Sequence, residues 1–309
     1  AMFPFLFPIA GNTQQQLPFG AMPMKIDQHY FEGMIPARRP DSSKEDYGRV
    51  MAVCGCRGYT GAAFFAAQAA VRTGSGVVTL AVPDCIYPIL ATKLQEPVVV
   101  PLEHCEDGKI TKKSVQAIAG QYKHAVLIGS GLGRSAGVRE AVQYLLAMET
   151  VPIVLDADGI NAICGNIDSL KNTKYPVVLT PHEKEFSRLL GREIRDREED
   201  ALSFAKAYHC IVLLKGHRTI IAAFDERIAV NETGNPGMAK GGSGDVLSGI
   251  ILSLLGQGLA PFDAAASGAY LHGKAGDFAA NEIGEYGMTP SDMLLKIPQV
   301  LRSFNSKEW

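Results

Sequence analysis

The sequence predicts a single α/β domain built on a doubly wound, mostly parallel sheet with helices on both faces. Short apolar runs of strand length recur along the chain, helical stretches separate them, and most runs are continuously apolar. A strand that is apolar at every position is buried on both faces, which is typical of a parallel sheet covered by helices. The regular alternation of strand and helix indicates the same architecture.

The elements follow in order from residue 49. Strands are predicted at 49–54, 76–82, 124–129, 152–156, 176–180 and 210–215, and the helices among them at 61–73, 135–148, 182–190 and 198–209. Two further apolar runs, 219–224 and 227–230, predict a short antiparallel hairpin at the sheet edge. The remainder is predicted to be mostly helical, at 245–256, 261–281 and 288–303. No low-complexity linker or repeat divides these elements, so residues 36–309 are predicted to form one domain.

Residues 1–35 are interpreted as an N-terminal arm or an expression remnant. The first twenty are largely apolar but contain no Lys or Arg, and Pro4 and Pro8 interrupt them. A signal peptide has a charged start and a longer apolar core, and a membrane span needs about 20 apolar residues. Neither pattern occurs in this stretch, so we expect no membrane partner.

Charge and cysteine content narrow the functional class. Thirty basic and 32 acidic residues give a net charge of −2, which argues against a protein that binds nucleic acid through its charge. The six cysteines form no C-x-x-C pair and have no histidine at zinc-finger spacing. In a chain of this size they are typical of reduced thiols in a cytosolic protein.

The segment GNPGMAKGGSGDVLSGIILSLL, residues 234–255, carries the strongest local signal. A glycine-rich turn that leads into a helix presents backbone N–H groups at the positive end of the helix dipole, which suits a phosphate. Glycine also allows the backbone to approach a ligand closely. Gly241, Gly242, Ser243 and Gly244 are therefore candidates for a phosphate-cradling loop.

Asp245 stands where this loop enters the helix, and its carboxylate would repel the anion that the loop attracts. One interpretation is an N-cap or first-turn aspartate, which stabilises a helix by about 0.5–2 kcal/mol. The other is a general base, or a metal partner, beside a transferring phosphoryl group. The residues alone leave both interpretations open.

Two common nucleotide motifs fail on spacing. The chain contains no G-x-x-x-x-G-K-[ST] string, and GSGLGR at 129–134 reads G-x-G-x-G where a dinucleotide fingerprint requires G-x-G-x-x-G. A classical NAD-dependent dehydrogenase is therefore only weakly indicated.

The string TGNPGMAKGGSGDVLSGII at 233–251 resembles the signature of ADP- or ATP-dependent NAD(P)H-hydrate dehydratases, a family of the ribokinase-like superfamily. Other segments agree in order, and the resemblance extends over residues 36–303: KEDYGRVMAVCG, GYTGAA, RTGSGVVTLAVP, LIGSGLG, VLDADGIN, LTPHEKEFSRLLG, LLKGHRTII and YLHGKAGD. A single glycine-rich motif would be a weak signal, whereas this ordered set is specific.

The resemblance implies a ribokinase-like fold and a metabolite-repair activity. Such enzymes dehydrate the S form of NADH or NADPH hydrate and release phosphate together with AMP from ADP, or ADP from ATP. By resemblance, Asp245 would be the catalytic base, and the amides of residues 242–244 would stabilise the transferring phosphoryl group. The sequence does not separate ADP from ATP, or NADH hydrate from NADPH hydrate, although bacterial members of the family mostly use ADP.

The resemblance also assigns binding residues by position. The hydrated dinucleotide would contact Ala62, Gly131, His182 and Asp245, and the adenine nucleotide would contact Lys215, Gly216, His217, Arg218, Thr219 and Gly244. Glu185 would reach Mg²⁺ through water, because in this family His182 replaces the Asn of the superfamily N-x-x-E motif and Mg²⁺ sheds water reluctantly.

Taken singly, most of these residues have simpler interpretations. His182 follows Thr180-Pro181 and suits a helix cap, and Lys215 suits a solvated charge at a strand end. Asp156 and Asp158 are interpreted as strand-end or supporting residues, since Asp favours turns. Only the ordered context of the motifs favours the functional reading.

Partners and location are implied by the same family. We expect a cytoplasmic homo-oligomer, a tetramer as in relatives, that acts beside an NAD(P)H-hydrate epimerase. Many bacterial members carry that epimerase as a preceding domain, and the roughly 40 residues before the match are too few for it. The chain is then a stand-alone dehydratase or half of a longer protein, and we expect no turnover of the R form.

Two rival functions share parts of this pattern. A small-molecule kinase of the same superfamily would use the same loop and Asp245 but leave a phosphorylated product. A non-catalytic nucleotide sensor would keep the fold, but it would gain nothing from a base directed at the phosphoryl group. The K-G-x-x-T and T-P-H-x-x-E-F strings favour the dehydratase.

Overall fold

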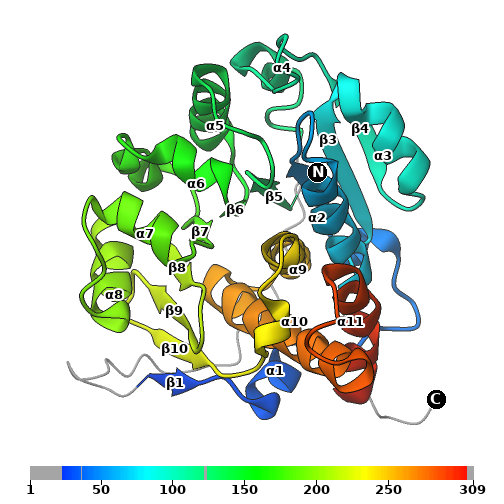
Figure 1. Ribbon diagram of the computed structural model, residues 1–309, viewed down its shortest axis with the longest axis vertical. Helices are drawn as coiled ribbons and strands as arrows, with labels where there is room; N and C mark the ends of the chain where they lie inside the picture. The colour runs from blue at the N-terminus through cyan, green and yellow to red at the C-terminus, as the bar shows by residue number, and fades with distance from the viewer. Residues whose placement is uncertain (1–22, 36, 122–123, 305–309) are drawn as a thin grey trace.

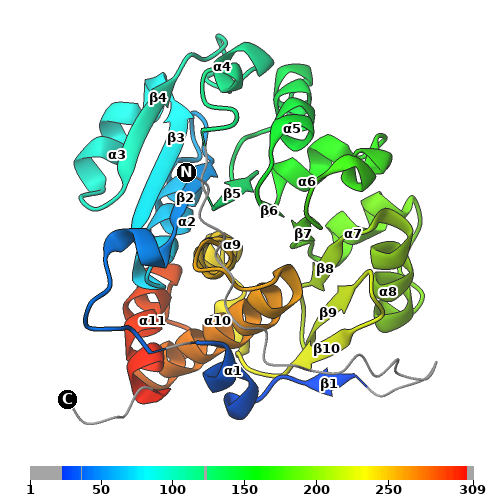
Figure 2. The ribbon, with the colours of Figure 1, turned by 180° about the vertical axis from the view of Figure 1, so that it is seen from behind.

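The structure, a computed structural model, describes residues 23–35, 37–121 and 124–304 of the chain. One ten-stranded sheet has the order β1-β10-β9-β8-β7-β6-β5-β2-β3-β4, with β4 and β1 at its two ends (Figures 1 and 2). Its strands are Met24–Lys25 (β1), Arg49–Val53 (β2), Val77–Pro83 (β3), Val98–Leu102 (β4), Ala125–Ile128 (β5), Ile153–Leu155 (β6), Val178–Leu179 (β7), Ile211–Leu214 (β8), Thr219–Ala223 (β9) and Ile228–Asn231 (β10). Only β9 runs antiparallel to its neighbours, β8 and β10, which confirms the predicted, mostly parallel sheet.

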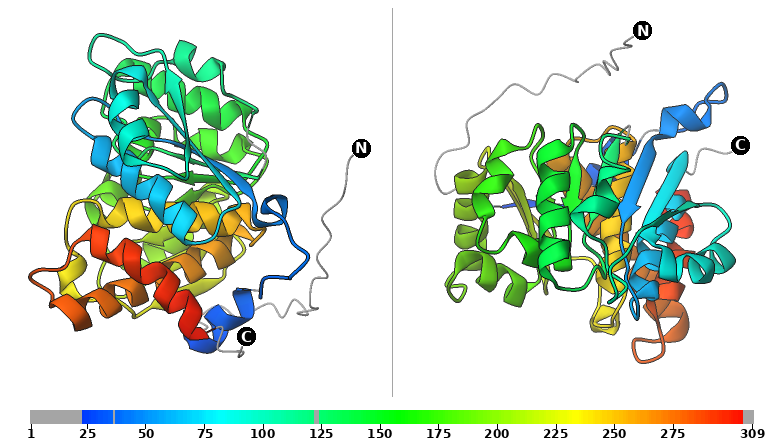
Figure 3. Two further views of the ribbon diagram at one scale, coloured as in Figure 1. Left: turned by 90° about the vertical axis from the view of Figure 1, so that its right-hand side faces the viewer. Right: turned by 90° about the horizontal axis from the view of Figure 1, so that it is seen from above.

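Helices cover both faces of this sheet (Figure 3). They are Gln28–Met34 (α1), Thr60–Arg72 (α2), Tyr87–Lys93 (α3), Lys112–Gln116 (α4), Ala136–Met148 (α5), Asp158–Ile163 (α6), Glu183–Leu190 (α7), Arg197–Tyr208 (α8), Ser243–Gly256 (α9), Pro261–Ile283 (α10) and Pro290–Phe304 (α11). Successive side chains of β2 enter two different cores. Ala52 packs with α2, α9, α10 and α11 on one face, whereas Val53 packs with α5, α6, α7 and α8 on the other.

The predicted strands are all present, with ends that differ by at most two residues, but two strands were missed. β4 has the sequence VVVPL and lies at the edge of the sheet, where Pro is tolerated. β1 contains only two residues and pairs in parallel with β10. The predicted hairpin β9–β10 is therefore confirmed as antiparallel, but its place at the sheet edge was wrong because β1 covers β10.

The N-terminal part of the described chain belongs to the fold. Ile26 and Phe31 are buried, and the ring of Phe31 lies 5.1 Å from that of Tyr270 on α10. The folded unit thus reaches upstream of the predicted boundary at residue 36, at least to Met24. Residues 1–22 of the predicted arm lie outside the described residues.

The helix that follows the glycine loop lies near the middle of the molecule, between α2 and α10 (Figure 1). The predicted buried face of α9 is confirmed: Val246, Leu247, Ile250, Ile251, Leu254 and Leu255 are all buried. Its opposite side is buried too, at Leu252 and Ser253, so α9 is enclosed all round.

Small residues let α9 approach α2 closely. α2 presents the buried alanines Ala63, Ala66, Ala67, Ala69 and Ala70. At Gly249 of α9 a Cβ atom would lie only 2.2 Å from the backbone oxygen of Ala66. Contact between backbones cannot be relieved by a change of rotamer, so the separation of the two helices is fixed.

Two further features bear on cellular context. Within the described ranges no helix is both long enough and apolar enough to cross a membrane. All six cysteines are free, at positions 54, 56, 85, 105, 164 and 210.

Gly249→Ala tests the contact between α2 and α9. We expect it to lower the free energy of unfolding by about 1–3 kcal/mol, because the added methyl group must push backbone apart. Gly33→Ala is the matched control: Gly33 is also helical, but a Cβ there would meet nothing within 4 Å. Urea unfolding should show a loss for the first variant only, and equal stabilities would contradict this account.

Candidate active site

Two predicted site residues, Lys215 and His182, lie at the carboxyl ends of the parallel strands together with Asp156, predicted as a supporting residue, and Ser130, which was not predicted. Asp156 directly follows β6, Lys215 directly follows β8, and Ser130 and His182 lie a short step beyond β5 and β7. Ligands of open α/β sheets bind at this edge, in the crevice where the strand order reverses. Here the order reverses between β2 and β5, because β3 and β4 continue on one side of β2 and β5 to β8 on the other.

The predicted dinucleotide residues Ala62 and Gly131 meet at that reversal point. Gly55, just after β2, donates its N–H to the carbonyl of Ser130 at 2.8 Å. A Cβ on Gly131 would lie 2.7 Å from the Cβ of Ala62, and Gly131 has a φ of +67°. Gly131 is therefore required both by its left-handed backbone and by the close approach of α2.

Asp245 lies in the first turn of α9, two residues after the helix starts, and is partly buried. Gly242 with a φ of +101° forms the N-cap, so Asp245 does not occupy the cap position. Burial and, second to it, the charge of Asp156 raise the pKa of Asp245 to about 7, although the Ser130 hydroxyl and the charge of Lys215 act in the opposite direction. A carboxylate that titrates near neutral pH has the proton affinity of a general base.

Asp156 ties together the ends of four strands. Its side chain is almost fully buried, and its Oδ1 atom accepts a hydrogen bond from the Thr180 hydroxyl at 2.7 Å and lies 3.4 Å from Lys215 Nζ. Its Oδ2 atom accepts from the Ser130 hydroxyl at 3.0 Å. These donors satisfy both carboxylate oxygens of a side chain that is buried. Sequence reasoning treated Asp156 as a supporting residue and did not foresee this network.

Asp158 contacts the loop that follows β5. Its Oδ2 atom accepts from the backbone N–H of Gly133 at 2.8 Å, and its Oδ1 atom lies 3.4 Å from Arg134 Nε. It therefore holds the loop that follows β5, as expected for a supporting residue.

The predicted phosphate-cradling loop packs against α2 at Gly242 and is open at Gly241. A Cβ on Gly242 would lie 2.7 Å from a ring carbon of Phe65 on α2, whereas nothing lies within 4 Å of the corresponding position on Gly241. Ser243 and Gly244 already belong to the first turn of α9. The N–H of Ser243 donates to the carbonyl of Lys240 at 3.2 Å. The first amides of a helix have no partner within the helix, so the remaining amides of this turn suit an anion.

His272 of α10 anchors the same turn and was missed by sequence reasoning. Its Nε2 atom lies 2.9 Å from the carbonyl oxygen of Ser243 and 3.3 Å from the Ser243 hydroxyl. Burial lowers the pKa of His272 to about 4, so the ring is neutral near pH 7 and its Nε2–H donates to the carbonyl. The segment YLHGKAGD contains this residue, but no local pattern relates it to the loop.

Lys215 faces the start of α9. A Cβ on Gly244 would lie 3.3 Å from Lys215 Nζ, so the ammonium lies close to the first turn. The backbone of Lys215 donates to the carbonyl of Pro181 at 2.9 Å, and Lys215 forms an isolated parallel bridge with His182. Its side chain is 22% exposed, so it is accessible to a ligand while it neutralises Asp156.

The rest of the predicted nucleotide segment forms the turn between β8 and β9. Gly216, His217 and Arg218 are exposed, and the Thr219 hydroxyl donates to the carbonyl of Gly216 at 3.1 Å. Arg218 has a φ of +57°. A non-glycine residue in the left-handed region is uncommon, so other contacts must hold this turn.

His182 and Glu185 form a capping box at the start of α7. The Nδ1 atom of His182 accepts from the Glu185 N–H at 3.2 Å, and a Glu185 oxygen accepts from the His182 N–H at 3.0 Å. The simpler interpretation of His182 is thus confirmed, although its side chain is 49% exposed and can still contact a ligand. Burial lowers the pKa of His182, so its neutral form is favoured.

A magnesium ion fits this edge only in part. Carboxylate oxygens are the donors it prefers, but one Glu185 oxygen serves the cap and the other lies 3.5 Å from His182 Nε2. The side chain of Glu185 is only 7% exposed. Within the described ranges no three His, Cys, Asp or Glu side chains are placed to hold a metal. The contact of Glu185 with Mg²⁺ through water therefore stays a prediction.

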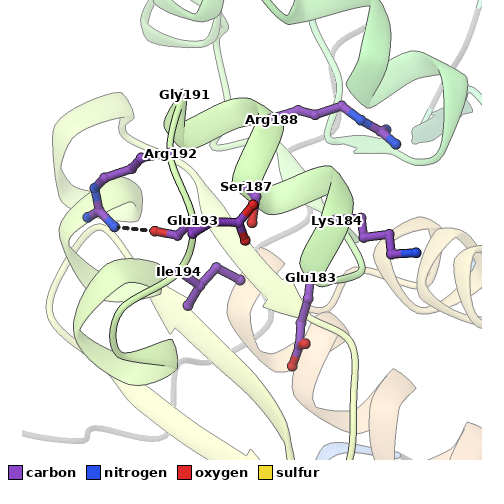
Figure 4. A pocket seen from close by; sticks show the side chains of 8 residues that line it. All are labelled: Glu183, Lys184, Ser187, Arg188, Gly191, Arg192, Glu193 and Ile194. Carbon is purple, nitrogen blue, oxygen red and sulfur yellow. Dashed lines mark hydrogen bonds between the residues drawn. The ribbon is translucent and has the colours of Figure 1, made fainter.

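A surface depression of about 960 Å³ lies on the outer side of α7 (Figure 4). It is lined by Glu183, Lys184, Ser187, Arg188, Gly191, Arg192, Glu193 and Ile194. None of the predicted site residues lines it, so it is separate from the strand-end site.

Comparison with known proteins agrees with this geometry. The sequence profile of the NAD(P)H-hydrate dehydratase family matches residues 50–299. A bifunctional NAD(P)H-hydrate repair enzyme of Moorella thermoacetica is 43% identical over 279 residues, which cover 88% of this chain and 53% of that protein. One from Escherichia coli is 36% identical over 272 residues, 86% of this chain and 50% of the other. The chain thus spans about half the length of these curated relatives.

Solved structures show the same architecture. The ADP/ATP-dependent NAD(P)H-hydrate dehydratase of Bacillus subtilis, co-crystallised with ATP and Mg²⁺, matches with a TM-score of 0.80 and 29% identity, covering 91% of this chain and 98% of the other. A ribokinase-like superfamily protein of Enterococcus faecalis matches with a TM-score of 0.81 and 28% identity, covering 94% and 99%. The chain belongs to the NAD(P)H-hydrate dehydratase family of the ribokinase-like superfamily.

Proposed function

We propose that this chain dehydrates the S form of NADH or NADPH hydrate at the expense of ADP or ATP, restoring the reduced dinucleotide. Phosphate and AMP, or phosphate and ADP, are the other products. The observation that carries the proposal is the place of Asp245, a carboxylate with a pKa of about 7 at the start of a helix whose free amides suit a phosphoryl group.

In this proposal Asp245 removes the proton from the hydroxyl group of the hydrated ring. The hydroxyl oxygen forms a bond to the terminal phosphorus of the nucleotide, and the bond from that phosphorus to the leaving nucleotide oxygen breaks. The bond between the ring carbon and this oxygen then breaks, and phosphate leaves with the oxygen and the bonding electrons. Loss of a proton from the neighbouring ring carbon restores the double bond. Water is removed in two steps, each with a good leaving group.

The other residues of the proposed site orient the substrates and neutralise the charge of the phosphoryl group. The amides of Gly242, Ser243 and Gly244 receive the charge of the transferring phosphoryl group, and Lys215, close to Gly244, adds a positive charge beside it. Asp156 fixes Lys215 in place and, by its own charge, strengthens Asp245 as a base. Ala62, Gly131 and His182 lie along the edge where the dinucleotide would bind.

Magnesium would enter with the nucleotide. It would neutralise phosphate oxygens, with Glu185 reached through water. The binding of ATP and Mg²⁺ by the Bacillus subtilis relative supports a nucleotide and this metal. We propose ADP as the preferred phosphoryl donor, only because bacterial members of the family mostly use ADP.

A small-molecule kinase is the second candidate, because it would use the same base and loop. Its structural support is a likeness to hydroxyethylthiazole kinase of Pyrococcus horikoshii at 15% identity and a TM-score of 0.58, which concerns the fold alone. Identities of 36–43% to repair enzymes favour dehydration. From the family resemblance we also propose a cytoplasmic homotetramer that works beside an epimerase. The relatives' description as bifunctional repair enzymes supports only the presence of a second repair activity.

The first test is absorbance at 340 nm with S-NADPH hydrate, Mg²⁺ and either ADP or ATP. We expect a nucleotide-dependent rise as the reduced ring is restored, and the donor that gives it is identified in the same experiment. Pure R hydrate should give no enzyme-dependent rise. A flat trace with both donors, from protein that still binds nucleotide, would favour the kinase.

Asp245→Asn tests the base. We expect turnover to fall by at least about 10²-fold, the lower end for a lost general base, while nucleotide binding persists because the amides remain. In the wild type, kcat should rise with pH through about 7, since the carboxyl group must lose its proton to act. A variant with unchanged turnover, or a flat wild-type profile between pH 6 and 8, would remove Asp245 from this role.

Lys215→Ala tests the charge beside the loop. We expect the KM for the nucleotide to rise about tenfold, as for loss of one charge-assisted contact, with a smaller change in kcat. Lys113→Ala is the control, since Lys113 forms only an exposed ion pair with Glu103. An unchanged nucleotide KM in the first variant would exclude Lys215 from the nucleotide site.

A further inference from the structure

Arg197, the first residue of α8, contacts the predicted nucleotide segment through its guanidinium group. Nη1 donates to the carbonyl oxygens of His217 at 2.8 Å and Arg218 at 3.4 Å, and Nη2 donates to that of Leu214 at 3.4 Å. One side chain thus spans the whole turn between β8 and β9. The five donors of a guanidinium lie in a fixed plane, which suits it to hold several acceptors at once.

The same contact explains the glycine of the segment K-G-H-R-T. A Cβ on Gly216 would lie 2.6 Å from Nη2 of Arg197. The absence of a side chain at Gly216 therefore makes room for the guanidinium. Gly216 is therefore needed for a contact within the protein, and this need does not depend on whether Gly216 also contacts a ligand.

Strands β8 and β9 hold the two ends of the turn, and Arg197 adds contacts to its exposed middle. Lys215 is tied to the sheet by its bond to Pro181. Beyond it, Arg218 adopts a left-handed conformation that a non-glycine residue rarely takes. The hydrogen bonds from Arg197 to His217 and Arg218 restrain this exposed part of the turn.

Glu183 in turn holds Arg197. Its carboxylate Oε1 lies 3.1 Å from Arg197 Nε, across the gap between α7 and α8. Figure 4 shows Glu183 at the end of α7, at the border of the depression described above. The side chain of Glu183 is 58% exposed, so this ion pair is the weaker part of the arrangement.

We propose that Arg197 is a positioning residue for the nucleotide, which fixes residues 215–219 in their binding conformation before the nucleotide arrives. The proposal rests on the assignment of this segment to the nucleotide in the proposed function. A turn that is already ordered loses less conformational freedom on binding, so affinity is gained without a direct contact. Arg197 therefore acts on nucleotide affinity and leaves Asp245 and the chemical step untouched.

The test compares Arg197→Ala with Arg192→Ala. Arg192 lies in the α7–α8 connection and pairs with Asp200 at 2.5 Å, and its hydrogen bonds go to Asp200 and Glu193, away from the nucleotide segment. Calorimetric titration with ADP and with ATP, in the presence of Mg²⁺ and without hydrate, gives the Kd of each protein. We expect Arg197→Ala to raise the Kd at least about tenfold, from the cost of ordering a few residues, and Arg192→Ala to leave it within about twofold.

Steady-state kinetics adds a readout that general destabilisation would not give. For Arg197→Ala the nucleotide KM should rise with its Kd, while kcat at saturating nucleotide and the KM for the hydrate stay near wild type. Arg197→Lys keeps the positive charge next to Glu183 but loses the planar guanidinium group with its several donors, so it should also weaken nucleotide binding. It replaces the alanine variant if that variant fails to fold. Glu183→Gln should have a smaller effect in the same direction.

The outcomes separate this proposal from the proposed function. If the wild type binds nucleotide but does not dehydrate the hydrate, and Arg197→Ala alone weakens binding, the function fails and the role of Arg197 stands. If the wild type dehydrates the hydrate and neither Arg197 variant changes nucleotide affinity, the role of Arg197 is overturned. Equal weakening by Arg192→Ala, or a wild type without nucleotide affinity, would overturn it as well.

Discussion

The close packing of α2 against α9 is the constraint on which the rest of the site depends. Gly249 and the alanines of α2 bring the two helices so near that backbone meets backbone. α2 carries Ala62 at one end of this contact, and α9 carries Asp245 and the end of the glycine loop. Because neither helix can shift without a clash, the base and the predicted dinucleotide surface keep a fixed relation. A phosphoryl transfer, in which catalysis is mostly positioning, benefits directly from such rigidity.

The charges of the site form a second constraint, centred on Asp156. Ser130 and Thr180 donate hydrogen bonds to this buried carboxylate, and Lys215 forms an ion pair with it. Its negative charge then acts on Asp245, which is itself partly buried, and both effects raise the pKa of Asp245. Lys215 limits this rise from the opposite direction. The pKa of Asp245 is therefore set by burial and by three residues that follow different strands: Asp156 after β6, Ser130 after β5 and Lys215 after β8.

Much of the fold could be predicted from the sequence because its strands are buried runs with a strong local signal. The missed elements, β1 and β4, are a two-residue strand and an edge strand with a proline, for which local pattern is weak. At the site, the glycine loop and Asp245 are recognisable because they are contiguous. Asp156, His272 and Arg197 are not, because their partners lie far along the chain, 59 residues away for Asp156 and Lys215 and 29 for His272 and Ser243. Only the packing of distant elements, strand ends for Asp156 and helices against the loop or turn for His272 and Arg197, reveals them.

The two sides of the site are built in different ways. The side of Ala62, Gly131 and Asp245 rests on backbone packing and positive-φ glycines, where a Cβ added at Gly131 or Gly249 would clash with α2. The nucleotide segment is an exposed turn held by hydrogen bonds from one arginine to three carbonyl groups. Changes in that turn, or in the residues around Arg197, can alter the fit to a nucleotide while the base stays where it is.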